Sequence, residues 1–202
     1  LLQAESLVEP TEWELWSDIH NNLGKVYYAT ADYSKAYEMF RELLDNQEHV
    51  MGLHHPDTFS TRYNLAFCLE QQNKDEEATQ ILENLLYDEI HHYGEFHRNV
   101  FDTRIKLLGS LGTEESIVEG ERLLSEQIEH LGSTDESLLY TYDKLSKSYL
   151  SSLDFQKAEE YYWLAHSIVK LYHGETSPLT LESKSQLAKI YRVKGDVKAS
   201  EK

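Results

Sequence analysis

The chain has 202 residues, of which 40% are hydrophobic, so it is long enough to bury a sizeable core. It carries 19 Lys and Arg against 36 Asp and Glu, which gives a formal net charge of −17. Such a surface repels phosphate groups, and this argues against nucleic acid or an anionic membrane as the main partner. No stretch approaches the roughly 20 apolar residues that a membrane-spanning helix needs.

The two ends of the chain and its one cysteine give expectations about the parent protein and its cellular compartment. Residues 1–10, LLQAESLVEP, lack a Met and a basic flank, so we expect the end of a preceding helix and not a signal peptide. The ending KASEK adds to the expectation that this is a fragment of a larger protein. A single cysteine, Cys68, cannot form an internal disulfide and fits a reducing compartment, so we expect a cytoplasmic protein.

Glycines at regular spacing mark an internal repeat. The segments that begin at Gly52 and Gly94 share Gly, His, Phe, Thr and Arg in register, and further copies begin at Gly132 and Gly174. The spacings are 42, 38 and 42 residues, as expected for a stacked repeat protein. The predicted units of a single array are residues 11–52, 53–94, 95–132, 133–174 and a partial unit 175–202.

Each unit has the periodicity of two helices. In the first helix a leucine stands beside a usually small residue, and another large residue follows four positions later, on the same face. These leucines are Leu23, Leu65, Leu107, Leu145 and Leu187. The residues four later are Tyr27, Leu69, Leu111, Tyr149 and Tyr191. The second helix supplies the matching small residues Ala36, Ala78, Ser116 and Ala158.

Local signals predict where these helices begin and end. Pro56 and Pro178 suit first helical positions, and Asp32 and Asp154 suit N-caps of second helices. The four repeat glycines stand where a helix must end in a residue with positive φ. Capping-box spacings begin at Thr11, Asn73 and Ser133.

The third unit departs from the pattern. It has Arg98 where Pro is expected, and it lacks four residues, which would shorten the helix pair by roughly 6 Å. It also contains three glycines: Gly109, Gly112 and Gly120. Because a glycine inside a helix costs on the order of 1 kcal/mol relative to Ala, we expect residues 104–124 to be the softest part of the array.

The repeat resembles the tetratricopeptide family, in particular its 42-residue variant found in kinesin light chain. The matching residues are Gly52, His55, Pro56, Thr58, Asn64, Leu65, Ala66 and Ala78. The resemblance covers roughly residues 11–202. It implies an all-α fold, a right-handed α-solenoid of antiparallel helix pairs with about nine to ten helices.

The resemblance also implies that a partner binds in a concave lane lined by the first helices. Residues next to the core leucines would line it: Asn22, Lys25, Asn64, Phe67, Lys106, Lys144, Lys147, Lys189 and Arg192. The two asparagines could contact a peptide backbone, or they could serve packing or face solvent. The basic residues could hold an acidic segment, or they could form a solvated face that pairs with nearby glutamates.

No constellation of residues indicates catalysis, a cofactor or a metal. The pairs His54-His55 and His91-His92 lack partners at ligand spacing, and Cys68 suits a small core position better than a nucleophile. The leading hypothesis is therefore a non-catalytic scaffold or adaptor that binds a protein or peptide. The alternative is a sensor or autoinhibitory array of a larger signalling protein, such as a nucleotide-binding receptor or a repeat-controlled protease.

Overall fold

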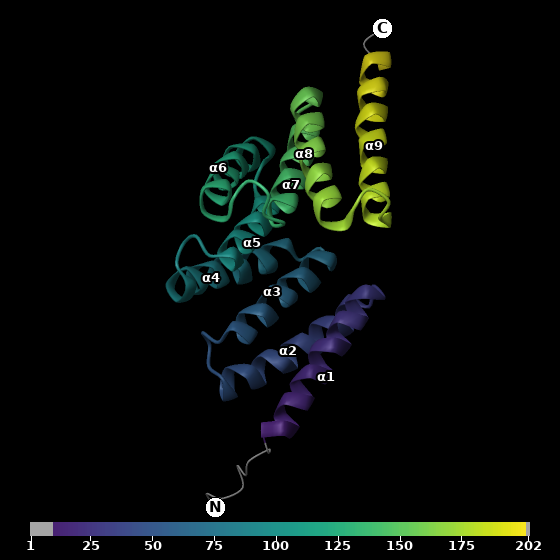
Figure 1. The fold of residues 1–202 in the computed structure, drawn as a ribbon. Helices are drawn as coiled ribbons and strands as arrows, with labels where there is room; N and C mark the ends of the chain where they lie inside the picture. Colours follow the sequence, from purple (N-terminus) through teal and green to yellow (C-terminus); the bar gives the residue numbers. More distant parts are fainter. Residues whose placement is uncertain (1–9, 201–202) are drawn as a thin grey trace, which may run out of the picture. The chain divides into compact units, whose positions relative to one another are not determined.

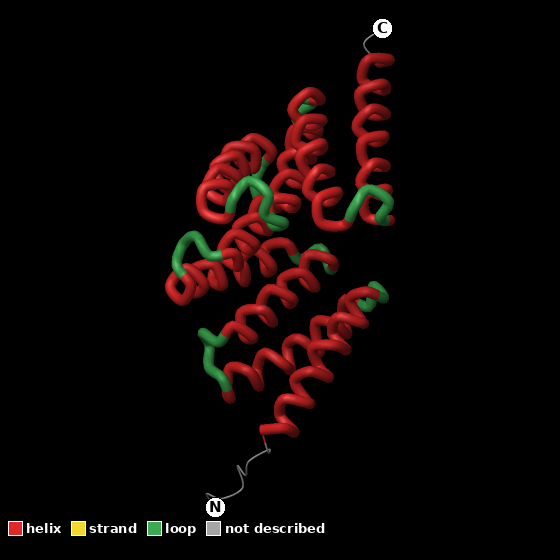
Figure 2. The backbone as a smooth tube through the Cα atoms, viewed as in Figure 1, coloured by secondary structure: helices red, strands yellow, loops and turns green. Residues whose placement is uncertain are grey.

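A computed structural model describes the backbone of residues 10–200, and the side chains of residues 12–181, 183–184 and 190–195. Within this part the chain forms nine α-helices and one short 3-10 turn, with no strand (Figures 1 and 2). The all-α class predicted from the repeat is confirmed.

The chain divides into two compact units, which meet in the sequence between His92 and Tyr93. The first unit contains α1 (Pro10–Ala29), α2 (Tyr33–Val50), α3 (Pro56–Gln71) and α4 (Asp75–Tyr93). The second contains α5 (Arg98–Leu107), the 3-10 turn η1 (Leu108–Ser110), α6 (Thr113–Leu131), α7 (Leu138–Ser151), α8 (Phe155–His173) and α9 (Pro178–Ser200). Within each unit, helices that follow one another in the sequence pack side by side, as a solenoid requires.

Several helix ends lie where the sequence predicts them. Pro56 and Pro178 begin α3 and α9. The Asp32 carboxylate accepts a hydrogen bond from the Lys35 amide at 3.3 Å, and Asp154 caps α8 in the same way. The four repeat glycines have φ values between 80° and 91°. A Cβ strains that conformation, so glycine is favoured at the end of the helix.

The three capping-box predictions are wrong. Thr11 lies inside α1. Asn73 has a φ of 59°, so it closes the turn after α3, while α4 begins at Asp75. The helix predicted from Ser133 begins instead at Leu138, because the Asp135 carboxylate accepts hydrogen bonds from the Ser137 amide at 2.9 Å and hydroxyl at 2.7 Å.

Two first helices have a cap that the sequence analysis missed. The Nδ1 atom of His55 accepts a hydrogen bond from the Asp57 amide at 3.2 Å, and His97 does the same for the Asn99 amide at 3.2 Å. The imidazole therefore takes the place of an Asp or Ser side chain at the N-cap. This gives the recurring linker histidines a structural role.

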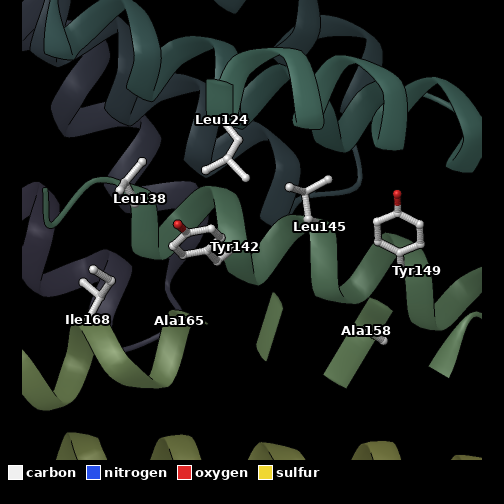
Figure 3. Close-up of a cluster of buried hydrophobic side chains, with 8 residues drawn as sticks. All are labelled: Leu124, Leu138, Tyr142, Leu145, Tyr149, Ala158, Ala165 and Ile168. Carbon is white, nitrogen blue, oxygen red and sulfur yellow. The ribbon is translucent and has the colours of Figure 1, made fainter. Parts of the chain in front are cut away.

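The small positions bring paired helices into close contact. A Cβ on Gly24 would lie only 2.6 Å from the Phe40 ring, so glycine allows α2 to approach α1. The corresponding residues on second helices, Ala36, Ala78, Ser116 and Ala158, are all buried. In the second unit, side chains from α6, α7 and α8 meet in one apolar cluster around Tyr142 and Leu145 (Figure 3).

The large residues of the repeat are buried less regularly than the small ones. Leu65 and Leu145 are 2% and 1% exposed, as predicted, whereas Leu23 is 41% exposed on α1. Leu111 is also exposed, because the chain leaves η1 with an extended backbone at this residue. Leu187 lies outside the residues whose side chains are described.

The third helix pair absorbs its missing residues in one helix only. α5 has 10 residues and α3 has 16, while α4, α6 and α8 all have 19. Gly120 is not a simple weak point, because a Cβ there would lie 2.8 Å from the Leu145 side chain. The glycine lets α6 pack closely against α7.

Candidate functional site

An open pocket of about 200 Å³ lies on the first unit. Lys25 and Tyr28 from α1, Phe40 from α2, and Asn64 and Phe67 from α3 line it. Lys25, Asn64 and Phe67 were predicted from their positions beside the core leucines. The structure therefore brings these three residues together.

The pocket is built from aromatic side chains that the helix packing holds in place. Phe40 is 2% exposed and belongs to a core cluster with Leu65 and Cys68, so it forms a rigid base. The Tyr28 and Phe67 rings meet edge to face with centroids 6.1 Å apart. Burial raises the pKa of the Tyr28 hydroxyl, and the neighbouring Tyr33 adds to this shift.

Two residues with polar side-chain groups line this otherwise apolar pocket. Asn64 is partly buried and offers both a donor and an acceptor, while the exposed Lys25 offers an ammonium group. The arrangement can hold an apolar group on the aromatic rings and fix a polar backbone or an anionic group beside them.

Tyr28 and Phe40 were missed as pocket residues. Tyr28 follows Lys25 by three positions, so a helical projection places the two residues side by side. Phe40 occupies a core position of the repeat, and its sequence position alone does not show that its buried ring also forms the base of the pocket.

The other predicted residues do not join this pocket. Asn22 is exposed on α1 and does not line it. Lys147 forms an ion pair of 2.6 Å with Asp143 on its own helix. The Lys144 ammonium lies 3.1 Å from where a Cβ of Gly109 would stand, and Arg192 is exposed.

For two other predicted lysines, the structure gives the burial of the side chain in one case and no side-chain position in the other. Lys106 is partly buried on α5, which packs against α7. The side chain of Lys189 lies outside the described residues.

Cys68 lies in the core, as expected. Its side chain is fully buried, and burial raises the pKa of its thiol to about 11. Because the thiolate is the nucleophilic form, this cysteine is inert at neutral pH. The residues that the structure describes contain no group of three or more His, Cys, Asp or Glu side chains placed to hold a metal ion.

Comparison with known sequences identifies the repeat. The profile of the tetratricopeptide repeat family matches residues 17–86, which span α2, α3 and parts of α1 and α4. Residues 17–86 are therefore similar to the tetratricopeptide repeat family. No curated protein matches the chain.

Solved structures extend the likeness in fold to most of the chain. Tetratricopeptide-like repeats of a putative kinesin light chain from Podosopora anserina align with a TM-score of 0.65 and 18% identity, over 96% of this chain and 92% of theirs. A variant of the same repeats aligns with a TM-score of 0.66 and 19% identity, over 92% of this chain and 91% of theirs. BtubC from P. vanneervenii aligns with a TM-score of 0.65 and 24% identity, over 85% of this chain and 69% of that one.

The fold is therefore that of a tetratricopeptide solenoid resembling kinesin light chain repeats. This fold is typical of non-catalytic scaffolds for protein interactions. Within the described part of the chain, every helix is too short or too polar to cross a lipid bilayer.

Proposed function

We propose that the chain is a non-catalytic scaffold that binds a peptide segment of a partner protein across α1 and α3. An apolar side chain of the peptide enters the pocket on the first unit. The observation that carries this proposal is the convergence of Lys25, Asn64 and Phe67 with Tyr28 around the buried Phe40 ring.

The size and lining of the pocket suit one large side chain. Small-molecule sites commonly enclose about 300–1,000 Å³. This pocket holds about 200 Å³, which is room for one large side chain. Burial of one large apolar side chain contributes roughly 2 kcal/mol. The base is already packed against Leu65 and Ala36, so little order has to be gained on binding.

The polar groups give the bound segment its orientation. The Asn64 amide can donate to a peptide carbonyl and accept from a peptide N–H, which suits an extended chain of any sequence. Lys25 lies beside the same pocket and favours a carboxylate in the neighbouring part of the peptide.

Basic residues of the second unit support a separate part of the proposal, an acidic partner segment that binds on that unit. Lys106 on α5 and Lys144 on α7 belong to helices that pack together. Lys147 is paired with Asp143, but exposed ion pairs contribute only about 0–1 kcal/mol, so a partner carboxylate can replace Asp143 at little cost.

The pocket can be tested with peptides selected from a random phage-display library against the 202-residue chain. Phe67→Ala and Asn64→Ala should each weaken the selected peptides about tenfold, because each removes roughly 1.4 kcal/mol of contact. Asn84→Ala, on the exposed side of α4, is the matched control and should leave the affinity unchanged. Unchanged binding to the Phe67→Ala protein would show that the peptides use another surface.

The acidic preference has its own test. The double variant Lys144→Glu with Lys147→Glu should lose affinity for acidic members of the selected set, most of all at low salt. Lys170→Glu on α8 reverses the charge of an exposed lysine elsewhere and is the control. Equal affinities of the double variant and the wild type would remove the acidic segment from the proposal.

A further inference from the structure

Three residues around the start of α5 and the start of α7 depart from the rest of the repeat. They are Arg98 and Asp102 of α5 and Asp135 of the α6–α7 loop (residues 132–137). The residues at the corresponding positions of the second repeat are Pro56, Ser60 and His55. The Arg98 guanidinium contacts the Asp135 carboxylate at 2.5 Å, so two of the departures form one ion pair.

Asp135 fixes the start of α7 and ties the α6–α7 loop to α5. Its Oδ1 atom accepts hydrogen bonds from the Ser137 amide at 2.9 Å and hydroxyl at 2.7 Å, while its Oδ2 atom accepts from Arg98. Tyr172 of α8 donates a separate hydrogen bond of 3.0 Å to the Thr134 carbonyl. The loop is therefore held from two sides, and the tie to α5 depends on Arg98.

Asp102 is a second carboxylate within reach of Arg98. It follows Arg98 by four positions, so both side chains lie on one face of α5. It is partly buried, and it forms no hydrogen bond or ion pair with any other residue that the structure describes. Arg98 thus lies between a carboxylate with which it is paired and a carboxylate that has no partner.

The charge of Asp102 changes at a pH close to neutrality. Burial raises the pKa of its carboxyl group to about 6, and Asp135 adds to this shift while Arg98 opposes it. The charged side chains described on α6 and α7, the helices that pack on α5, do not act on Asp102. Asp102 is therefore mostly neutral at pH 5 and ionised at pH 7.5.

We propose that Arg98, Asp102 and Asp135 form a pH-responsive switch that sets the order of the α6–α7 loop. When Asp102 is neutral, Arg98 has no competing charge, and its bond to Asp135 holds the loop on α5. When Asp102 ionises, a partly buried charge without a partner is costly, so it draws Arg98 away from Asp135. Asp135 keeps its two hydrogen bonds from Ser137, so α7 stays intact while the loop is freed from α5.

This inference goes beyond the proposed function. None of the three residues lines the pocket on the first unit, and none is among the lysines proposed to bind an acidic segment. The switch therefore stands or falls independently of peptide binding.

Backbone order parameters from ¹⁵N relaxation test the switch on the 202-residue chain at pH 5 and pH 7.5. At residues 133–136 the wild type should show about 0.85 at pH 5, as for a rigid backbone, and about 0.6 at pH 7.5. Asp102→Asn should stay near about 0.85 at both pH values, because Arg98 then has no competing charge. Arg98→Met should give about 0.6 at both, because the tie to α5 is absent.

Glu160→Gln is the matched control, because it removes one exposed carboxylate of α8 and should keep the wild-type dependence on pH. Asp102→Ser, which introduces the residue of the second repeat, takes the place of Asp102→Asn if circular dichroism shows that the Asn variant loses its helices.

Equal order of the wild-type loop at the two pH values overturns the proposal. So does a pH dependence that persists in Asp102→Asn or in Arg98→Met, or an Arg98→Met loop as rigid as the wild-type loop at pH 5. A loss of order at residues 162–168 of α8 together with the loop overturns it as well, since the whole unit would then loosen.

Discussion

The second and third helix pairs begin alike and pack differently. α3 and α5 each start behind a histidine cap, and each places a largely buried arginine against carboxylates of the following helix. Yet α4 fills its inner face with Leu82, whereas α6 has Gly120 at the same repeat position. α3 continues for 16 residues, and α5 stops after 10.

The difference shows that one repeat pattern can accommodate a deletion without losing its core. The shorter α5 still buries Phe101 and Ile105, and together with Leu108 of η1 they pack with Leu123 of α6. Gly120 replaces a large side chain by a closer helix contact, which is filled by Leu145 of α7. The space that Leu82 fills in the second pair is thus filled in the third pair by the Leu145 side chain of the next helix.

The largest effect on stability is expected from a substitution that makes the third helix pair more like the second. Gly120→Leu should lower the free energy of unfolding by about 3 kcal/mol, because the new side chain must displace the buried Leu145. Urea denaturation followed by circular dichroism measures the change. Val118→Leu, on the exposed side of α6, should leave stability within about 0.5 kcal/mol. A stable Gly120→Leu protein would mean that α6 and α7 can move apart freely.

A second difference between the two helix pairs concerns one repeat position. α5 has the carboxylate of Asp102 there, whereas α3 has the exposed Ser60. Burial raises the pKa of Asp102 to about 6 from 3.8, with a further contribution from Asp135 that Arg98 opposes. The folded state therefore holds this proton more tightly than the unfolded state. Its contribution to stability is present below pH 3.8 and is lost as the pH rises through about 6.

The substitution Asp102→Asn should remove the loss of stability that occurs as the pH rises through about 6. The variant should be more stable than the wild type by about 2 to 3 kcal/mol at pH 7.5, since each pKa unit corresponds to about 1.4 kcal/mol. At about pH 4 the two proteins should have nearly equal stability, because Asp102 is then protonated in the folded state. Denaturation at the two pH values checks this, and a difference that does not change with pH contradicts the assignment.

A smaller difference in stability is expected between the ion pairs of Arg62 in the second helix pair and those of Arg104 in the third. Arg62 joins three helices, because it contacts Asp88 of α4 at 2.7 Å and Glu48 of α2 at 3.3 Å. Among the described residues, the ion pairs of Arg104 are to α6 alone, through Glu119 and Glu126, and both of these carboxylates also pair with Arg122. Arg122 therefore still compensates their charge when Arg104 is removed.

Arg62→Met should accordingly cost about 2 kcal/mol of stability and Arg104→Met about 1 kcal/mol. The reason is that only the first change leaves carboxylates without a nearby arginine. Adding Arg122→Ala to Arg104→Met should raise the cost towards that of Arg62→Met. Strict additivity of these two changes would show that Arg122 does not compensate.

The features predicted correctly from the sequence are those fixed by neighbours along the chain. A glycine with positive φ, an Asp at an N-cap and a small residue at a helix crossing each depend on local geometry, so the repeat reveals them. Lys25, Asn64 and Phe67 were predicted to line the concave lane that the family resemblance implies, but the aromatic pocket that they share with Tyr28 and Phe40 was not predicted.

The features that were missed depend on neighbours distant in sequence. Leu23 and Leu65 hold the same repeat position, but only Leu65 has a preceding helix packed against it in the described chain. Gly120 was expected to be a weak point because the approach of Leu145 cannot be inferred from α6 alone. The Phe40 ring belongs to the core and to the pocket at once, and the repeat pattern indicates only the first role.

The smallest predicted effect concerns local motion in the third pair. The sequence suggested that all of residues 104–124 would be soft, but Arg104, Leu108, Leu123 and Leu124 are buried. Only residues 109–115, which run from η1 into the first turn of α6, form a continuous exposed run within this stretch. Amide hydrogen exchange should therefore be at least about a hundredfold faster at residues 109–115 than at residues 118–130. Similar protection of the two segments would show that the deletion in α5 leaves no flexible joint, and uniformly fast exchange from 104 to 124 would show that Gly120 weakens α6 despite its close packing.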